Sequence, residues 1–325
     1  MGKKRRKKGS GVKYDYENTF DKDLHGLDQF FVEEMMRNKV GLHYATKTIR
    51  SGRRFEVEIY PVFRKREDIP VPRVRYDARA QGNLNEKNSK KAFIRVVETN
   101  FGEGDYWMTL TYDPACLPAT KEEAQRKIGN YIRRVNRRRK KMGLANAKYV
   151  YITEWGGVRC HHHLIIEGGL SRDVLESLWG FSTVKDSSRL YPGEDGLAGL
   201  ATYMADKKRG KWERRWTPSK NLKKPAESVN HSKARRRQVE GMARDFEEIR
   251  TFFEKDRQWA RYEFREARVM YNNFNSAFYI HILARERRRR DEEGKQGKGT
   301  GGGSGAAVPG GSGSNGNRGM PPAHG

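Results

Sequence analysis

The sequence has 325 residues, and its 35% of hydrophobic residues is adequate for a core only if the tails are excluded from the folded part. With 67 Lys and Arg against 41 Asp and Glu, the net charge is +26, which favours a polyanionic partner, nucleic acid above all, although an anionic membrane surface would compete on charge alone. No stretch approaches the ~18 apolar residues of a membrane helix. The only cysteines, Cys116 and Cys160, are too few for a disulfide framework or a four-cysteine zinc site, although they could form a single disulfide.

Both ends of the chain have compositions that disfavour folding. Residues 1–13 contain six consecutive cations, Lys3 to Lys8, and a like-charge block repels itself, so a disordered basic arm is expected there. Residues 285–325 lack aromatic side chains and are dense in Gly, Ser and Pro, which predicts a disordered tail. No apolar segment follows the basic start, so no export signal is expected, and the scarce cysteines fit a reducing cytoplasm.

Between the tails, hydrophobic periodicity and turn residues predict a mixture of strands and helices. Residues 14–83 are assigned to an N-terminal hairpin and a proline-rich loop, and residues 84–284 to one domain. In chain order we expect a hairpin of 44–49 and 55–63, a helix over 86–99, a strand over 107–112, a helix from the Thr120 cap to Gly143, strands over 149–153 and 161–167, short helices capped by Ser171 and Asp195, and a hairpin of 264–271 and 278–283.

The strand over 161–167 begins with three histidines. Because residues two apart on a strand point to the same face, His161 and His163 project together and His162 points away. Glu154 ends the preceding strand, and an antiparallel pairing would bring its carboxylate beside them. Two histidines and one carboxylate leave coordination positions open, as in a catalytic metal site. Taken alone, however, a His-x-His run is more often a polar strand face.

Tyr203 flanks the apolar stripe of the helix expected after Asp195, and Lys207 lies one turn further on the same face. A tyrosine hydroxyl is a poor nucleophile at neutral pH unless a cation stabilises the phenolate, which a metal and a lysine would do. The alternative is a core tyrosine at a helix edge.

Three segments in order along the chain resemble the motifs of HUH-superfamily rolling-circle replication initiators, or Rep proteins. Residues 107–112 look like the first motif, Glu154 with residues 161–164 resembles the second, and Tyr203 with Lys207 the third. The runs at 100–105, 109–112 and 200–203 are similar to small Rep proteins of bacterial phages and mobile elements, particularly of Gram-positive hosts. The likeness spans about residues 84–283.

This resemblance implies an α+β, RRM-like or ferredoxin-like domain whose central antiparallel sheet presents the metal ligands. It also implies a metal-dependent, site-specific DNA endonuclease and strand transferase in a bacterial cytoplasm, with Mg²⁺ or Mn²⁺ as cofactor. Tyr203 would nick single-stranded origin DNA, keep a 5′-phosphotyrosine and later rejoin strands. Asp206 stands where the family's usual lysine would be, so Lys207 is expected to substitute. A relative with two catalytic tyrosines would carry the second one four residues after the first, where this chain has Lys207, so a single-tyrosine enzyme is expected. The sequence has no phosphate-binding loop motif, so a host helicase and polymerase would be partners.

The segment after Tyr203 alternates tryptophans with cations, which suits base stacking and phosphate attraction on single-stranded DNA. The alternative is a solvated basic loop whose tryptophans fold back into the core. Two other functions also stay open: a nucleic-acid-binding protein without catalysis, which the charge alone supports, and a relaxase, although relaxases generally place the tyrosine before the histidines. The candidate DNA-binding residues are Trp212, Arg214, Arg215, Trp216 and Lys220.

Overall fold

The structure is a computed structural model that describes residues 22–23, 42–63, 78–155, 159–183, 186–206, 215–272 and 277–287. The chain divides into two compact units, Met1–Glu286 and Arg287–Gly325, and the helices and strands described below all belong to the first. The basic arm expected over residues 1–13 lies outside the described residues. So does most of the tail expected from residue 285, whose first two residues instead complete a strand.

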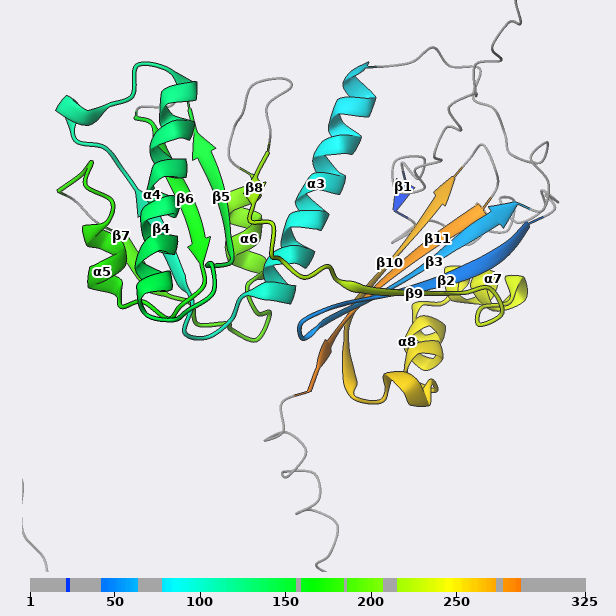
Figure 1. The fold of residues 1–325 in the computed structure, drawn as a ribbon. Helices are drawn as coiled ribbons and strands as arrows, with labels where there is room; N and C mark the ends of the chain where they lie inside the picture. The colour runs from blue at the N-terminus through cyan, green and yellow to red at the C-terminus, as the bar shows by residue number, and fades with distance from the viewer. Residues whose placement is uncertain are drawn as a thin grey trace, which may run out of the picture. The chain divides into compact units, whose positions relative to one another are not determined.

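The described residues form two antiparallel sheets with α-helices packed against them, so the expected α+β class is confirmed (Figure 1). No helix among them is long and apolar enough to cross a bilayer. The α-helices are α3 (Ala78–Asn100), α4 (Lys121–Lys141), α5 (Arg172–Ser177), α6 (Ala198–Ala205), α7 (Arg236–Arg244) and α8 (Phe246–Glu254). The strands are β1 (Lys22–Asp23), β2 (Leu42–Ser51), β3 (Arg54–Phe63), β4 (Tyr106–Leu110), β5 (Tyr149–Glu154), β6 (His161–Ile166), β7 (Asp186–Arg189), β8 (Thr217–Pro218), β9 (Ala226–Asn230), β10 (Tyr262–Asn272) and β11 (Ala277–Glu286).

One sheet has the strand order β1-β10-β11-β3-β2-β9. Both expected hairpins are present with longer strands, β2 with β3 and β10 with β11. The two hairpins also pair with each other, since Ile282 of β11 lies opposite Val57 of β3. Their apolar side chains pack against residues of α7 and α8, including Val239 and Ile249. The domain boundary expected between residues 83 and 84 therefore falls between strands of one sheet, with β2 and β3 before it and β9, β10 and β11 after it.

The turn between β2 and β3 depends on Gly52. Its φ is 58°, and a Cβ atom added there would overlap the backbone carbonyl oxygen of Glu98 on α3. Gly143, after α4, offers a control, because its φ is 73° but a Cβ atom would meet nothing within 4 Å. Positive φ alone costs an alanine roughly 1 kcal/mol. We expect Gly143→Ala to lower the free energy of unfolding by about that amount, and Gly52→Ala to lower it by clearly more, as measured by urea denaturation. Equal losses would contradict the close approach of this turn to α3.

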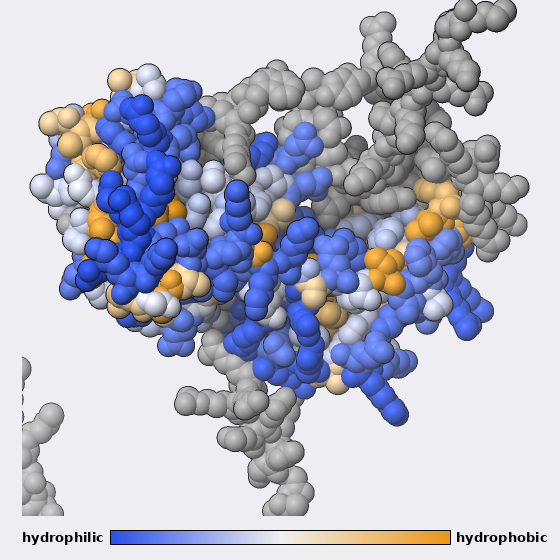
Figure 2. Space-filling view, in the orientation of Figure 1, coloured by the Kyte–Doolittle hydropathy of each residue, from blue (hydrophilic) through white to orange (hydrophobic). Residues whose placement is uncertain are grey.

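The second sheet has the order β7-β4-β6-β5-β8, and helices cover both of its faces. Thr120 caps α4 as expected, its hydroxyl oxygen accepting a hydrogen bond from the backbone N–H of Glu123. The apolar stripe of α4 packs on one face with Met108 and Leu164, while its exposed side is basic and lies in a hydrophilic region of the surface (Figure 2). The stripe consists of Ala124, Ile128, Tyr131, Ile132 and Val135.

The opposite face of this sheet is covered by α3 and α6. Phe93 and Val97 of α3 and Ala201 and Met204 of α6 pack there, together with Ile152 of β5. The inward stripe expected for α6 is confirmed. This helix is what holds Tyr203 over the sheet.

The expected cap of α6 was wrong. The helix begins at Ala198 with Leu197 as its N-cap residue, and Asp195 makes no side-chain cap. Instead Glu98 of α3 accepts a hydrogen bond from the backbone N–H of Leu197 at 2.8 Å. A carboxylate there satisfies an otherwise unpaired N–H group and complements the helix dipole. The cap is thus supplied by a residue distant in sequence.

A buried charge cluster joins α3 to β3 and β11. The guanidinium of Arg95 donates to Glu56 at 2.6 Å and to Glu58 at 2.7 Å, and His281 and Arg54 also contact Glu56. Burial acts to raise the pKa of Glu56, but the hydrogen bond from His281 and the charges of Arg95 and Arg54 outweigh it and hold that pKa far below its ordinary value. Glu56 is therefore ionised in the folded protein.

We expect Glu56→Gln to lower the free energy of unfolding by about 3 kcal/mol at neutral pH, because it removes the buried negative charge that Arg54 and Arg95 both contact and leaves Arg95 with Glu58 alone. A depressed pKa contributes stability above the unfolded value near 4.5 and loses it as the pH falls below that value. The gap between wild type and variant should therefore shrink below about pH 4.5 in urea titrations. Glu263→Gln, at an exposed carboxylate of β10, is the control and should show little effect at any pH. A gap that stays constant down to pH 2 would contradict the ionised state of Glu56.

Candidate active site

The register of β5 and β6 brings the candidate metal ligands together. Glu154 lies directly opposite His161, and Ile152 lies opposite His163. His161 and His163 are two residues apart on β6, so both project from the face that α3 and α6 cover. The antiparallel pairing expected from the sequence is confirmed, and the strand geometry alone explains why these three side chains meet.

Three ligand atoms converge within this group. Nε2 of His161 lies 3.1 Å from Nε2 of His163 and 3.1 Å from Oε2 of Glu154, and Nε2 of His163 lies 3.6 Å from the same oxygen. A cation about 2.1 Å from each of three ligands, at angles of roughly 90–110°, requires the ligands to be about 3.0–3.4 Å apart. Two of the three separations fall in this range and the third, 3.6 Å, is slightly longer, so the group could hold a single divalent cation.

A backbone contact orients the first histidine as a ligand. Nδ1 of His161 lies 3.0 Å from the carbonyl oxygen of Arg159. A carbonyl oxygen can only accept, so Nδ1 carries the hydrogen and Nε2 of the neutral ring presents its lone pair toward Glu154 and His163. Outer contacts of this kind fix the tautomer that a metal requires.

His162 lies on the other face of the sheet and has a structural role. Its ring is fully buried, with Nε2 at 2.7 Å from the hydroxyl of Tyr112 and Nδ1 at 2.9 Å from the hydroxyl of Thr153. Burial, with smaller contributions from His161 and His163, lowers the pKa of His162 to about 3, so the ring is neutral at pH 7. It therefore cannot exchange places with the two histidines that face Glu154.

Cys160 also faces away from the candidate ligands. Its side chain is buried among the residues that α4 covers, and burial raises the pKa of its thiol to about 11. A thiol with so high a pKa is a poor metal ligand at neutral pH.

Tyr203 lies beside the candidate ligands. Its ring centroid is 5.8 Å from that of His163 and 6.2 Å from that of Trp107 on β4, and Trp107 stacks on His163 at 6.1 Å. The residue is 48% exposed, so part of it is open to an external substrate. A nucleophile candidate thus stands at the edge of the metal-binding group.

The cation expected to assist Tyr203 lies outside the described residues, because Lys207 follows the last described residue of this segment. Asp206 forms an ion pair with Lys90 of α3 at 2.6 Å. Asp206 thus has a cationic partner that sequence reasoning missed. No local pattern could have indicated Lys90, because its contact with Asp206 arises only when α3 packs on α6.

The candidate DNA-binding residues are only partly described, since Trp212 and Arg214 lie outside the described residues. Arg215 forms an ion pair with Glu86 at 3.2 Å. The indole N–H of Trp216 donates to Ser89, and its ring packs against Phe93. Trp216 is thus folded back onto α3, as in the alternative of a basic loop whose tryptophans fold back into the core. Lys220 is exposed.

Comparison with known proteins gives one family. Residues 105–229 match the family model described as replication-associated protein ORF2/G2P. The matched segment covers well under half of the chain, but it contains Glu154, the histidines of β6 and Tyr203. No curated protein and no solved structure matches the chain. The family match supports a replication initiator that acts on DNA.

Proposed function

We propose that the chain is an HUH-type, single-tyrosine rolling-circle initiator of a bacterial phage or mobile element, which nicks single-stranded origin DNA and later rejoins the strands. The observation that carries this proposal is the convergence of Glu154, His161 and His163 beside the exposed Tyr203 on one sheet face. The family match over the same segment supports it. A basic chain of net charge +26 suits a DNA substrate.

In the proposed reaction, the hydroxyl oxygen of Tyr203 attacks the scissile phosphorus, and the bond from phosphorus to the 3′-oxygen breaks. The tyrosyl proton is transferred, directly or through water, to the departing oxygen, which becomes a 3′-hydroxyl primer. The other product is a 5′-phosphotyrosine. Because this ester retains the phosphodiester energy, attack on it by a 3′-hydroxyl restores Tyr203 and rejoins the DNA without ATP.

Glu154, His161 and His163 would hold Mg²⁺ or Mn²⁺, and their mixed nitrogen and oxygen atoms suit Mn²⁺ more readily. When bound, such a cation supplies positive charge that polarises the scissile phosphate. Lys207, four residues after Tyr203 in sequence, would stabilise the phenolate. A host helicase and polymerase would then unwind and copy the template.

The test is covalent capture. Single-stranded oligonucleotides that tile the DNA on both sides of the gene, each labelled at its 3′ end, are incubated with the full chain and Mn²⁺. A 5′-phosphotyrosine keeps the 3′ label on the protein, so a labelled band at the position of the protein on a denaturing gel is the expected result. Omission of Mn²⁺ should abolish the band.

The net charge also favours a second candidate, a nucleic-acid-binding protein without catalysis. That protein would retain the oligonucleotides in a native gel but give no labelled protein under denaturing conditions. Such a result, with folded protein and Mn²⁺ present, would exclude the nicking enzyme.

A further inference from the structure

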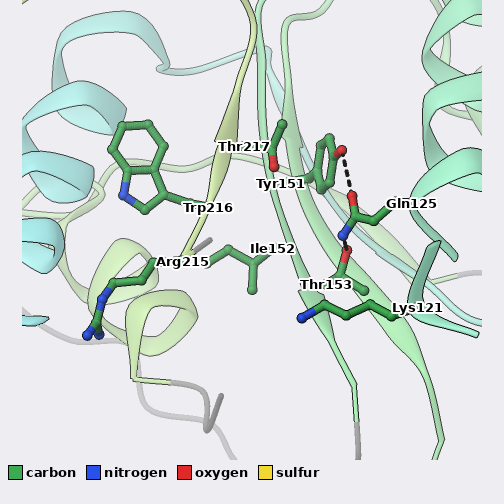
Figure 3. Close-up of a pocket in the computed structure, with 8 residues that line it drawn as sticks. All are labelled: Lys121, Gln125, Tyr151, Ile152, Thr153, Arg215, Trp216 and Thr217. Carbon is green, nitrogen blue, oxygen red and sulfur yellow. Dashed lines mark hydrogen bonds between the residues drawn. The ribbon is translucent and has the colours of Figure 1, made fainter. Parts of the chain in front are cut away.

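A pocket opens at the edge of β5, the strand that ends with Glu154 (Figure 3). Ile152 and Thr153 line it, and Thr153 immediately precedes Glu154. Among the described residues, β8 pairs with only Val150 and Tyr151, so this last part of β5 extends beyond its neighbour strand. Ile152 shares the sheet face of Glu154 and Thr153 points to the opposite face, so a strand of DNA that leaves the metal-binding group around this edge would reach the pocket.

An amide group from α4 lies at the centre of the pocket's polar wall. Gln125 accepts a hydrogen bond from the hydroxyl of Tyr151 at 3.0 Å, and its amide N–H donates to the hydroxyl of Thr153 at 2.9 Å (Figure 3). A glutamine amide has two N–H donors and two lone pairs on its oxygen. These two bonds hold Gln125 in place and leave it one donor and one acceptor, the pair of groups that can contact the edge of a base.

The same hydrogen bonds connect the pocket to β6. The hydroxyl of Thr153 lies 2.9 Å from Nδ1 of His162, whose Nε2 lies 2.7 Å from the hydroxyl of Tyr112. His162 stands between the two histidines that face the candidate metal position. The wall of the pocket is thus fixed to the strand that carries the ligands.

The other wall is aromatic and both sides carry a cation. Trp216 is held by its hydrogen bond to Ser89 and by Phe93, while Lys121 lies on the α4 side and Arg215 on the α3 side (Figure 3). An aromatic ring, a hydrogen-bonding amide and flanking cations are the features with which proteins bind an unpaired base and its phosphate.

We infer that this pocket binds one unpaired nucleotide of the DNA strand next to the scissile phosphate, with Gln125 contacting the base edge and Lys121 its phosphate. The inference rests on the proposed function for the identity of the strand. It makes Gln125 and Lys121 binding residues: Lys121 would hold the strand in place, and Gln125 would set which base stands beside the cleavage point.

The test measures binding without cleavage. Wild type, Gln125→Leu, Lys121→Ala and the control Lys141→Ala are titrated in EDTA against fluorescent single-stranded oligonucleotides, and the intact strand is compared with versions that lack one base. Lys141 is exposed and lies about 30 Å along α4 from Lys121, so the control makes the same charge change away from the pocket. Thermal unfolding of each variant checks that it is folded.

For wild type, loss of the base at one position should weaken binding by roughly 5- to 100-fold. In Gln125→Leu the same loss should have a smaller effect than in wild type, because the hydrogen bonds to the base edge are already absent and only the stacking on Trp216 is left to lose. Lys121→Ala should weaken binding of the intact strand more than Lys141→Ala does. Weak binding by wild type, or base effects that are equal in wild type and Gln125→Leu, would overturn the inference. If covalent capture succeeds but the base effect is equal in wild type and Gln125→Leu, the pocket inference is wrong and the nicking reaction stands. If the base effect differs but no covalent adduct forms, the nicking reaction is wrong and the pocket inference stands.

Discussion

The Tyr203→Phe variant is expected to give no labelled protein in the covalent-capture experiment and to lower the single-turnover rate of nicking by about a thousand-fold or more. The change removes only the hydroxyl, which would form the bond to phosphorus. The ring that packs beside Trp107 and His163 stays, and the side chain is half exposed, so the stability should change little. Rates from quenched time courses and thermal unfolding of the two proteins check both parts.

The matched control is Tyr191→Phe. Tyr191 is 75% exposed and has no ring contact with the candidate ligands, so its variant should react like wild type. If labelled protein persists in Tyr203→Phe, peptide mapping of the adduct would identify the residue used instead, and the assignment of the nucleophile would be wrong.

The position of Tyr203 is the part of the site that the sequence determined least directly. The chain has 15 tyrosines, and Tyr203 was selected by the order of three motifs. The structure adds an independent reason, because α6 packs on the face from which His161 and His163 project. The histidines themselves could be predicted from local pattern, since a two-residue repeat on a strand fixes which side chains share a face.

Local pattern failed where contacts join distant segments. Asp195 was expected to cap α6 because a short acidic residue before an apolar stripe is the usual signal. In the fold, Glu98 takes that role from α3, and Lys90 of the same helix pairs with Asp206. Likewise, alternation predicted the hairpins of β2–β3 and β10–β11 but could not show that β3 and β11 are neighbours. Periodicity specifies elements, whereas their partners depend on tertiary packing.

The second large effect is expected from the removal of one candidate metal ligand. His161→Ala should lower the affinity for Mn²⁺ by at least about 100-fold, because one of three converging ligands is lost, and isothermal titration calorimetry measures this without any DNA. Covalent capture should fall in parallel at Mn²⁺ concentrations that saturate wild type.

His231→Ala is the control, since it removes an imidazole that lies beside His43, away from the candidate ligands. Because His161 is partly exposed and, among the described residues, its ring contacts the backbone of Arg159 and its fellow ligands, its loss should cost little stability. An unchanged Mn²⁺ affinity in His161→Ala, or an equal loss in His231→Ala, would mean that the cation binds elsewhere. Glu154, His161 and His163 would then form a polar strand face that binds no metal, and metal-dependent catalysis at this site would be excluded.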